Sequence, residues 1–69
     1  MNEAEAITHA LRWLYQCFAV RGAIDVEAAQ EPGGPWVVAL ACAALAAPLR
    51  VRIYPSGVVR QLPAPDEAR

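Results

Sequence analysis

The sequence has no lysine and only one histidine, one serine and one threonine among its 69 residues. Nucleophile–base pairs and metal sites are built from such side chains, so few catalytic combinations are available. His9 and Cys17 are eight residues apart. On a helix that spacing is about 12 Å along the axis, too far for one residue to activate the other. We therefore expect a protein that is not an enzyme and that requires no cofactor or metal ion.

Cysteines and long apolar runs are also scarce. Cys17 and Cys42 are too few for a disulfide framework and their spacing fits no zinc pattern. We expect both thiols to be buried and reduced, with a bond between them as the alternative. The apolar stretch 36–47 is too short to span a bilayer. The N-terminal segment is acidic and lacks a basic region followed by an apolar run. We expect a cytoplasmic protein that does not bind a membrane.

The charged residues are unevenly distributed, although the net charge is only −1 and the pI is near 5.6. All six basic residues are arginine. Residues 1–35 contain five acidic residues and two arginines, whereas residues 36–62 contain three arginines and no acidic residue. Arginine forms planar, bidentate contacts with carboxylates and phosphates. An arginine-rich, lysine-free composition is also what a GC-rich genome encodes. The negative net charge makes nucleic acid an unfavourable partner.

Residues 2–20 have the pattern of an amphipathic helix. Asn2 is the expected N-cap, and two glutamates follow in the first turn, where the helix dipole favours negative charge. Gly22 is the expected stop signal. The apolar stripe at helical spacing consists of Ile7, Ala10, Leu11, Leu14 and Phe18. Trp13 lies on the flank of this stripe, where it either folds over the edge of a sheet or contacts a partner.

The rest of the chain has the pattern of four strands. Residues 23–29 alternate, with Asp25 and Glu27 on the polar side. Two prolines and two glycines in 31–35 end this strand. Residues 36–42 are apolar on both sides, and 49–54 and 58–62 form a hairpin. We expect one α+β domain over residues 1–62, with the helix packed on an antiparallel β-meander of about four strands, and a flexible tail over 63–69. In the alternative order α-α-β-β, residues 36–47 are helical.

The turn Tyr54-Pro55-Ser56-Gly57 predicts the register of the hairpin. Proline presets the first corner, and glycine takes the left-handed position that closes a three-residue loop with a G1 bulge. This register places Arg52 opposite Arg60, with Arg50 diagonal to Arg60 on the same face. Like charges in these positions destabilise a sheet unless solvent dilutes them or an acidic group meets them.

The side of 36–42 that carries Val37, Ala39 and Ala41 is apolar as well. In a domain with one helix, that side faces away from the helix. It is either an exposed strip or a surface covered by a second copy or by another protein.

The order of elements resembles small PepSY-type and gas-vesicle GvpO-type domains, in which one helix packs on a meander. The shared pattern is helix, acidic strand, Gly/Pro turn, apolar strand, and a hairpin with Val58-Val59-Arg60 after the turn. It covers residues 4–62 and implies the fold class without functional residues. In its small size, acidic charge and lack of a catalytic set, the chain also resembles the inhibitors that phages and mobile elements produce, such as anti-CRISPR proteins. That resemblance implies an inhibitory role.

These observations lead to three hypotheses for function. The first is a small non-catalytic protein-binding module that covers its partner's surface and forms a homodimer, with inhibition of a host-defence complex as one version. The second is a homo-oligomeric structural or assembly subunit. The third is a weak single-stranded nucleic-acid binder that uses arginine and an aromatic side chain on a sheet. The predicted contact residues are Arg50, Arg52, Tyr54, Arg60, Trp13 and Trp36.

Overall fold

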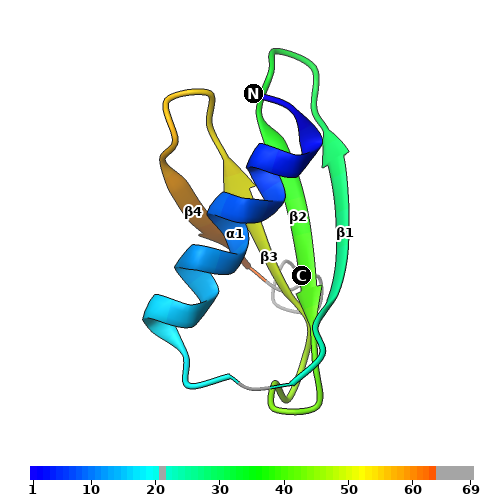
Figure 1. Cartoon of the computed structure of the whole chain (residues 1–69). Coiled ribbons are helices and arrows are strands. Elements are labelled where there is room, and N and C mark those ends of the chain that lie inside the picture. The colour runs from blue at the N-terminus through cyan, green and yellow to red at the C-terminus, as the bar shows by residue number, and fades with distance from the viewer. Residues whose placement is uncertain (21, 64–69) are drawn as a thin grey trace.

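The structure is a computed structural model that describes residues 1–20 and 22–63. One helix, α1 (Glu3–Cys17), lies across one face of a four-stranded antiparallel sheet (Figure 1). The sheet is a meander in which each strand pairs with the next along the chain. Its strands are β1 (Asp25–Gln30), β2 (Trp36–Ala41), β3 (Leu49–Ile53) and β4 (Val59–Leu62). The predicted α+β architecture is confirmed.

The alternative in which residues 36–47 form a second helix is wrong. Residues Trp36–Ala41 form a strand that pairs with β1 on one side and β3 on the other. Two adjacent β-branched residues, Val37 and Val38, favour an extended backbone at its start. After Ala41 the chain turns, and the Leu45 N–H donates to the Cys42 carbonyl oxygen at 3.1 Å. The tail predicted over 63–69 begins at the exposed Pro63, and its other residues lie outside the described part of the chain.

The start of α1 follows the prediction. Asn2 is the N-cap, and its side-chain oxygen accepts a hydrogen bond from the Glu5 N–H at 2.9 Å. The Glu5 carboxylate accepts one from the Asn2 N–H at 3.1 Å, which completes a capping box. Two of the N–H groups that every helix leaves unpaired at its start are thereby satisfied.

The end of α1 differs from the prediction of a helix that continues to residue 20. The last helical residue is Cys17, and Phe18 has an extended backbone (φ −135°, ψ 142°). Because the chain leaves the helix here, the Phe18 ring packs edge-to-face on Trp13, with 5.7 Å between the ring centroids, and Val20 is buried. These contacts replace a further helical turn. Gly22, the expected stop signal, instead has a positive φ (89°) in the segment that leads to β1.

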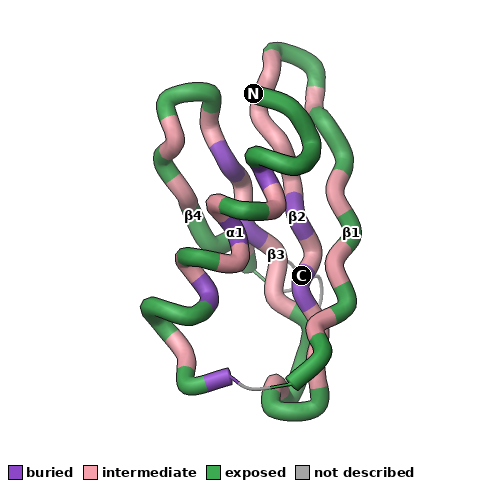
Figure 2. Tube along the Cα trace, in the orientation of Figure 1, coloured by how far each residue is buried: buried purple, intermediate pink, exposed green. Residues whose placement is uncertain are grey.

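The core lies between α1 and the centre of the sheet. Ala6, Ala10 and Leu14 are fully buried on the helix and meet fully buried side chains of β2 and β3: Val38, Leu40, Val51 and Ile53. Figure 2 shows these buried segments on α1, β2 and β3. Because two of the three helical contacts are alanines, the helix axis can approach the sheet closely. Ile7 and Leu11, predicted for the centre of the stripe, are half-buried at its side.

The predicted hairpin register is confirmed. The Gly57 N–H donates to the Tyr54 carbonyl oxygen at 2.8 Å, and the Tyr54 N–H donates to the Val58 carbonyl oxygen at 2.9 Å. Gly57 has φ 92°, the left-handed conformation that this loop requires. Arg52 therefore pairs directly with Arg60 across the strands.

Candidate functional site

The helix α1 covers one face of the sheet, and no helix covers the other face among the described residues. Side chains alternate along each strand, so one set points toward α1 and the other points away from it. We call the face away from α1 the outer face. The pairing register assigns to it residues from all four strands: Asp25, Glu27, Ala29, Val37, Ala39, Ala41, Arg50, Arg52, Arg60 and Leu62.

The outer face is divided into three bands that run along the strands. On β1, Asp25 and Glu27 form an acidic band, and both are exposed. On β2, Val37, Ala39 and Ala41 form an apolar strip, and all three are half-buried. On β3 and β4, the cluster of Arg50, Arg52 and Arg60 forms a basic band. Net charge conceals this separation because the two charged bands nearly cancel.

Arg52 is held by an acidic residue of its own chain. Its Nε donates to Glu31 Oε1 at 2.7 Å, and its Nη2 donates to Glu31 Oε2 at 3.3 Å. Glu31 follows β1 directly, so the side chain of Arg52 passes over the end of β2 to reach it. The hydrogen bonds to Glu31 raise the pKa of Arg52 further above its already high value. Of the two ways in which the repulsion between Arg52 and Arg60 could be reduced, solvent or an acidic group, this ion pair supplies the acidic group.

Tyr54 lies beside the same arginines at the end of β3. Its pKa is lowered, first because the Arg52 guanidinium favours the phenolate by hydrogen bonding, with a smaller contribution from Arg60. The structure therefore brings together the four residues Arg50, Arg52, Tyr54 and Arg60 that the sequence predicted for one sheet face.

Arg50 and Arg60 are less engaged than Arg52. Arg50 Nη2 donates to the Pro63 carbonyl oxygen at 3.4 Å, while its Nε has almost no solvent contact and no acceptor within the described part of the chain. Arg60 is exposed and forms no ion pair with any described residue. Because long arginine stems cover neighbouring apolar surface, the apolar strip is half-buried even though no helix lies over it. Two guanidinium groups of the cluster thus remain for an external acidic group.

The two tryptophans do not join this cluster. Trp36 pairs across the strands with the buried Ile53, so both side chains point toward α1. The Trp36 Nε1 donates to the Met1 carbonyl oxygen at 3.4 Å. Trp13 packs on Phe18 and lines a hollow between α1 and the β3–β4 hairpin. Both are half-buried on the helix side of the sheet. The predicted contact residues therefore lie on two opposite faces of the sheet.

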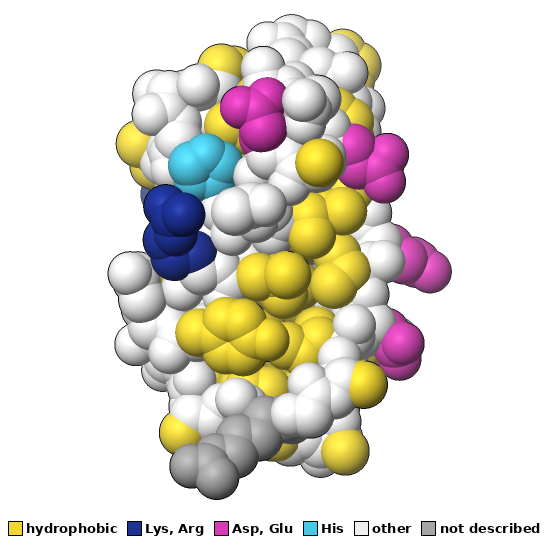
Figure 3. All heavy atoms as spheres, viewed as in Figure 1, with side chains coloured by type: hydrophobic (Ala, Val, Ile, Leu, Met, Phe, Trp, Pro, Cys, Tyr) yellow, Lys and Arg dark blue, Asp and Glu magenta, His cyan; other side chains and the backbone are white. Residues whose placement is uncertain are grey.

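The helix side also exposes apolar surface that the sequence did not predict. Figure 3 shows hydrophobic side chains along the seam between α1 and β1, with acidic side chains at the β1 edge. Ile7, Leu11 and Val26 are half-buried there, and Tyr15 is 55% exposed. A single helix is too narrow to cover all four strands of the sheet. The seam remains open for this reason.

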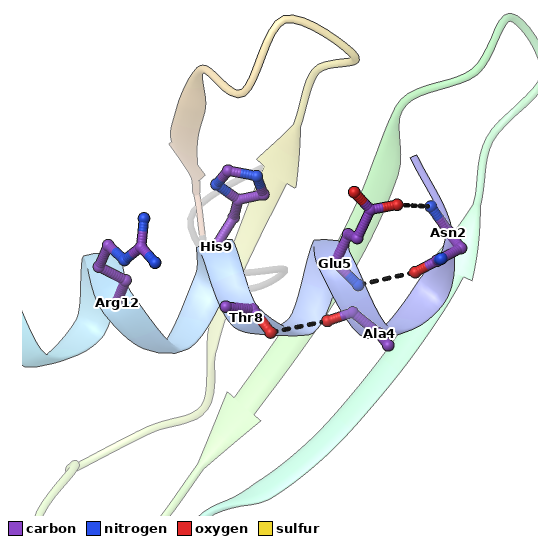
Figure 4. A pocket seen from close by; sticks show the side chains of 6 residues that line it. All are labelled: Asn2, Ala4, Glu5, Thr8, His9 and Arg12. Carbon is purple, nitrogen blue, oxygen red and sulfur yellow. Dashed lines mark hydrogen bonds between the residues drawn. The ribbon is translucent and has the colours of Figure 1, made fainter.

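A shallow hollow on the exposed side of α1 contains the single histidine. It has a volume of about 340 Å³ and is lined by Asn2, Ala4, Glu5, Thr8, His9 and Arg12. In Figure 4, Glu5 is occupied by the capping box, Thr8 donates to the Ala4 carbonyl oxygen, and His9 and Arg12 project from the same side of the helix as Glu5. The Thr8 hydroxyl is therefore hydrogen-bonded to the backbone and not to the histidine.

Neither cysteine is disulfide-bonded, and the expectation that both are buried is wrong for Cys17. Cys17 is exposed because the chain leaves the helix directly after it, whereas Cys42 is half-buried against the core. Within residues 1–20 and 22–63, no group of three or more His, Cys, Asp or Glu residues could hold a metal ion. Over the same residues, no helix has the length and apolar character needed to cross a membrane.

Comparisons with protein-family models, curated proteins and solved structures found no match to this chain. The function must therefore be inferred from the surface chemistry described above.

Proposed function

We propose that this protein is a small, non-catalytic protein-binding module that acts in the cytoplasm by covering part of a partner's surface. The observation that carries the proposal is the outer face, where an apolar strip lies beside an arginine cluster. Apolar surface gives binding energy by leaving water, and arginine is enriched in the residues that dominate protein interfaces.

The state of the individual arginines supports this proposal. Glu31 orients Arg52, which reduces the entropy lost when that side chain is fixed by a partner. Arg50 and the exposed Arg60 form no ion pair among the described residues. A partner that brings carboxylates to this face would satisfy them with charge-assisted hydrogen bonds. Occlusion of a host-defence complex by an inhibitor is one version of such a role.

A binding experiment with matched charge reversals tests the proposal. A tagged protein is used to isolate a partner from the native host, and the affinity of the purified pair is then measured by calorimetry. Arg60→Glu should weaken binding at least about tenfold, since it places a repulsive charge in the interface. Arg12→Glu makes the same charge change on the helix side and should leave the affinity unchanged. Equal effects of the two variants, or no effect of Arg60→Glu, would remove the outer face from the account.

A homo-oligomeric structural or assembly subunit is the second candidate, and a specific observation favours it. The acidic band and the arginine cluster lie on the same face, on opposite sides of the apolar strip. Such a face is complementary to itself. The same acidic band repels phosphate groups, and it therefore counts against single-stranded nucleic acid as the ligand despite Tyr54 and the arginines.

A further inference from the structure

The order of charges across the outer face restricts how two copies can meet. One row of the sheet contains Glu27, Ala39 and Arg50 on three successive strands. Adjacent strands are about 4.8 Å apart, so Glu27 and Arg50 of one chain are separated by roughly 10 Å of sheet, with Ala39 between them. No ion pair joins these two side chains among the described residues, and they are placed symmetrically about β2.

A twofold axis can relate two stacked sheets in two ways. An axis perpendicular to the strands places β1 on β1 and therefore places acidic residues against acidic residues. An axis parallel to the strands and centred on β2 places β2 on β2 and β1 on the partner's β3. Only the second arrangement brings opposite charges together in both halves of an isologous interface.

We propose that two copies of this protein associate through their outer faces about a twofold axis parallel to β2, so that Glu27 of each copy pairs with the partner's Arg50. This inference rests on the outer face as the binding surface of the proposed function, and it names a second copy as an occupant of that surface. Rotation about an axis parallel to the strands leaves the height of each residue along the strand direction unchanged. Glu27 therefore meets the partner's Arg50 at the same level at which Ala39 meets the partner's Ala39.

The side chains at the centre of the face fit this arrangement. Val37, Ala39 and Ala41 are small, so two sheets can approach to the roughly 10 Å that aligned β-sandwich layers adopt. Glu27 is exposed, and Arg50 is half-buried and forms no ion pair with any described residue. In the dimer, the apolar strip of one copy packs against the apolar strip of the other. Glu27 and Arg50 each gain an oppositely charged partner.

The size of the face sets the strength of the association. In this arrangement only β1, β2 and β3 overlap the partner, because β4 extends past it. Three strands about 4.8 Å apart, each about six residues long at roughly 3.3 Å per residue, give a face of about 300 Å² per copy. The total of about 600 Å² is well below the roughly 1,200 Å² at which specific, stable interfaces begin. We expect a reversible dimer with a dissociation constant in the micromolar range or above.

A charge-exchange experiment by sedimentation velocity tests the arrangement. Glu27→Arg and Arg50→Glu are each prepared alone and are examined with the wild type over a concentration series from micromolar to millimolar. Each single variant should have a dimer dissociation constant at least about tenfold above that of the wild type, because both symmetric contacts become repulsive. An equimolar mixture of the two variants should form a heterodimer again, since one contact is reversed in sign and the other is native.

A charge-matched mixture controls for nonspecific attraction. Arg12→Glu has the same net charge as Arg50→Glu, but its change lies on the helix side of the molecule. In a mixture of Glu27→Arg with Arg12→Glu, the Arg12→Glu variant should dimerise with itself as the wild type does, while Glu27→Arg should remain monomeric. Circular dichroism of every variant checks that the fold is retained, and the double variant Glu27→Arg/Arg50→Glu should dimerise by itself.

Each result decides the matter. A monomeric wild type at millimolar concentration, or a mixture of the two charge variants in which Glu27→Arg associates no more than it does in the control mixture, would overturn the proposed dimer. The proposed protein-binding function would survive that result if Arg60→Glu still weakened binding to the isolated partner. If the mixture associates but no variant changes binding to another protein, the dimer stands and the homo-oligomeric role replaces the first proposal.

Discussion

Arg52 and Glu31, 21 residues apart in the chain, form a two-point ion pair with a shortest distance of 2.7 Å across the end of β2. The pair explains how Arg52 can lie directly opposite Arg60 in the sheet. Part of the positive charge at this position is balanced by Glu31, and the remaining repulsion is reduced by solvent around the exposed Arg60. The ion pair also connects the β1–β2 turn to the centre of the arginine cluster.

The ion pair should make a small contribution to the free energy of unfolding. Its side chains are 32% and 36% exposed, and solvent screens ion pairs of this exposure. A double-mutant cycle with Glu31→Gln and Arg52→Gln, measured by urea unfolding at low protein concentration, isolates the interaction. The coupling energy should be small and favourable, and it should decrease in about 0.5 M sodium chloride, where charges are screened over a few ångströms. A coupling energy of zero at low salt would contradict the role given to Glu31.

Tyr54 should ionise at lower pH than an ordinary tyrosine, because the Arg52 guanidinium favours its phenolate. In a Tyr15→Phe background the phenolate absorbance reports Tyr54 alone, since the chain has two tyrosines. The native pKa should lie below the ordinary value of about 10, and Arg52→Gln should raise it toward that value. An unchanged titration in Arg52→Gln would disprove the contact.

The same pKa shift determines how stability depends on pH. Because the pKa of Tyr54 is lower in the native state than in the unfolded state, the unfolded state binds more protons between the two values. The free energy of unfolding should therefore rise with pH, relative to a Tyr54→Phe variant, from the native pKa up to about 10. The contribution is lost as the pH falls through the native pKa.

Asn2→Ala should lower the free energy of unfolding by about 1 kcal/mol, since it removes the acceptor for the Glu5 N–H at the start of α1. Asn2→Asp retains an acceptor and should change stability much less. Thermal unfolding of the three proteins measures the difference. Equal midpoints for Asn2→Ala and the wild type would show that the helix start does not depend on its cap.

Gly57→Ala should destabilise the hairpin by about 1–2 kcal/mol because a side chain is unfavourable at φ 92°. The added Cβ would be in ordinary van der Waals contact, with His9 Cε1 at 3.6 Å, so the cost comes from the backbone. Ser56→Ala, in the same turn, is the control and should change stability by less than about 0.5 kcal/mol. A similar small effect of both substitutions would contradict the assigned turn.

The parts of the fold that depend on local chemistry could be predicted from the sequence. The Pro55-Ser56-Gly57 loop determines the register of β3 and β4, and the cap at Asn2 determines where α1 begins. The end of α1 could not be predicted in this way, because it depends on the packing of Phe18 and Val20 against the core. These contacts are tertiary, and they outweigh the helix propensity of the following residues.

The candidate site was predicted in part. The arginine cluster and Tyr54 followed from the hairpin, but the Glu31 contact was missed because residues 31–35 were treated only as a turn. A signal was present: Ala29, Val37 and Arg52 lie in one row, and Glu31 is two residues beyond Ala29 on the same side of the chain. Similarly, Trp36 alternates with the buried Val38 and Leu40, which already places it on the opposite side from the arginines.

The most direct test of the outer face as the contact surface is an NMR dilution and titration series with methyl-labelled alanine. The chain has 15 alanines, and they report separate surfaces. Ala39 and Ala41 lie in the apolar strip, whereas Ala6 and Ala10 lie on the buried face of α1. We predict that the Ala39 and Ala41 methyl signals shift with protein concentration or with added partner while the Ala6 and Ala10 signals stay in place. Unchanged Ala39 and Ala41 signals, together with shifts at alanines on the helix side, would contradict the account.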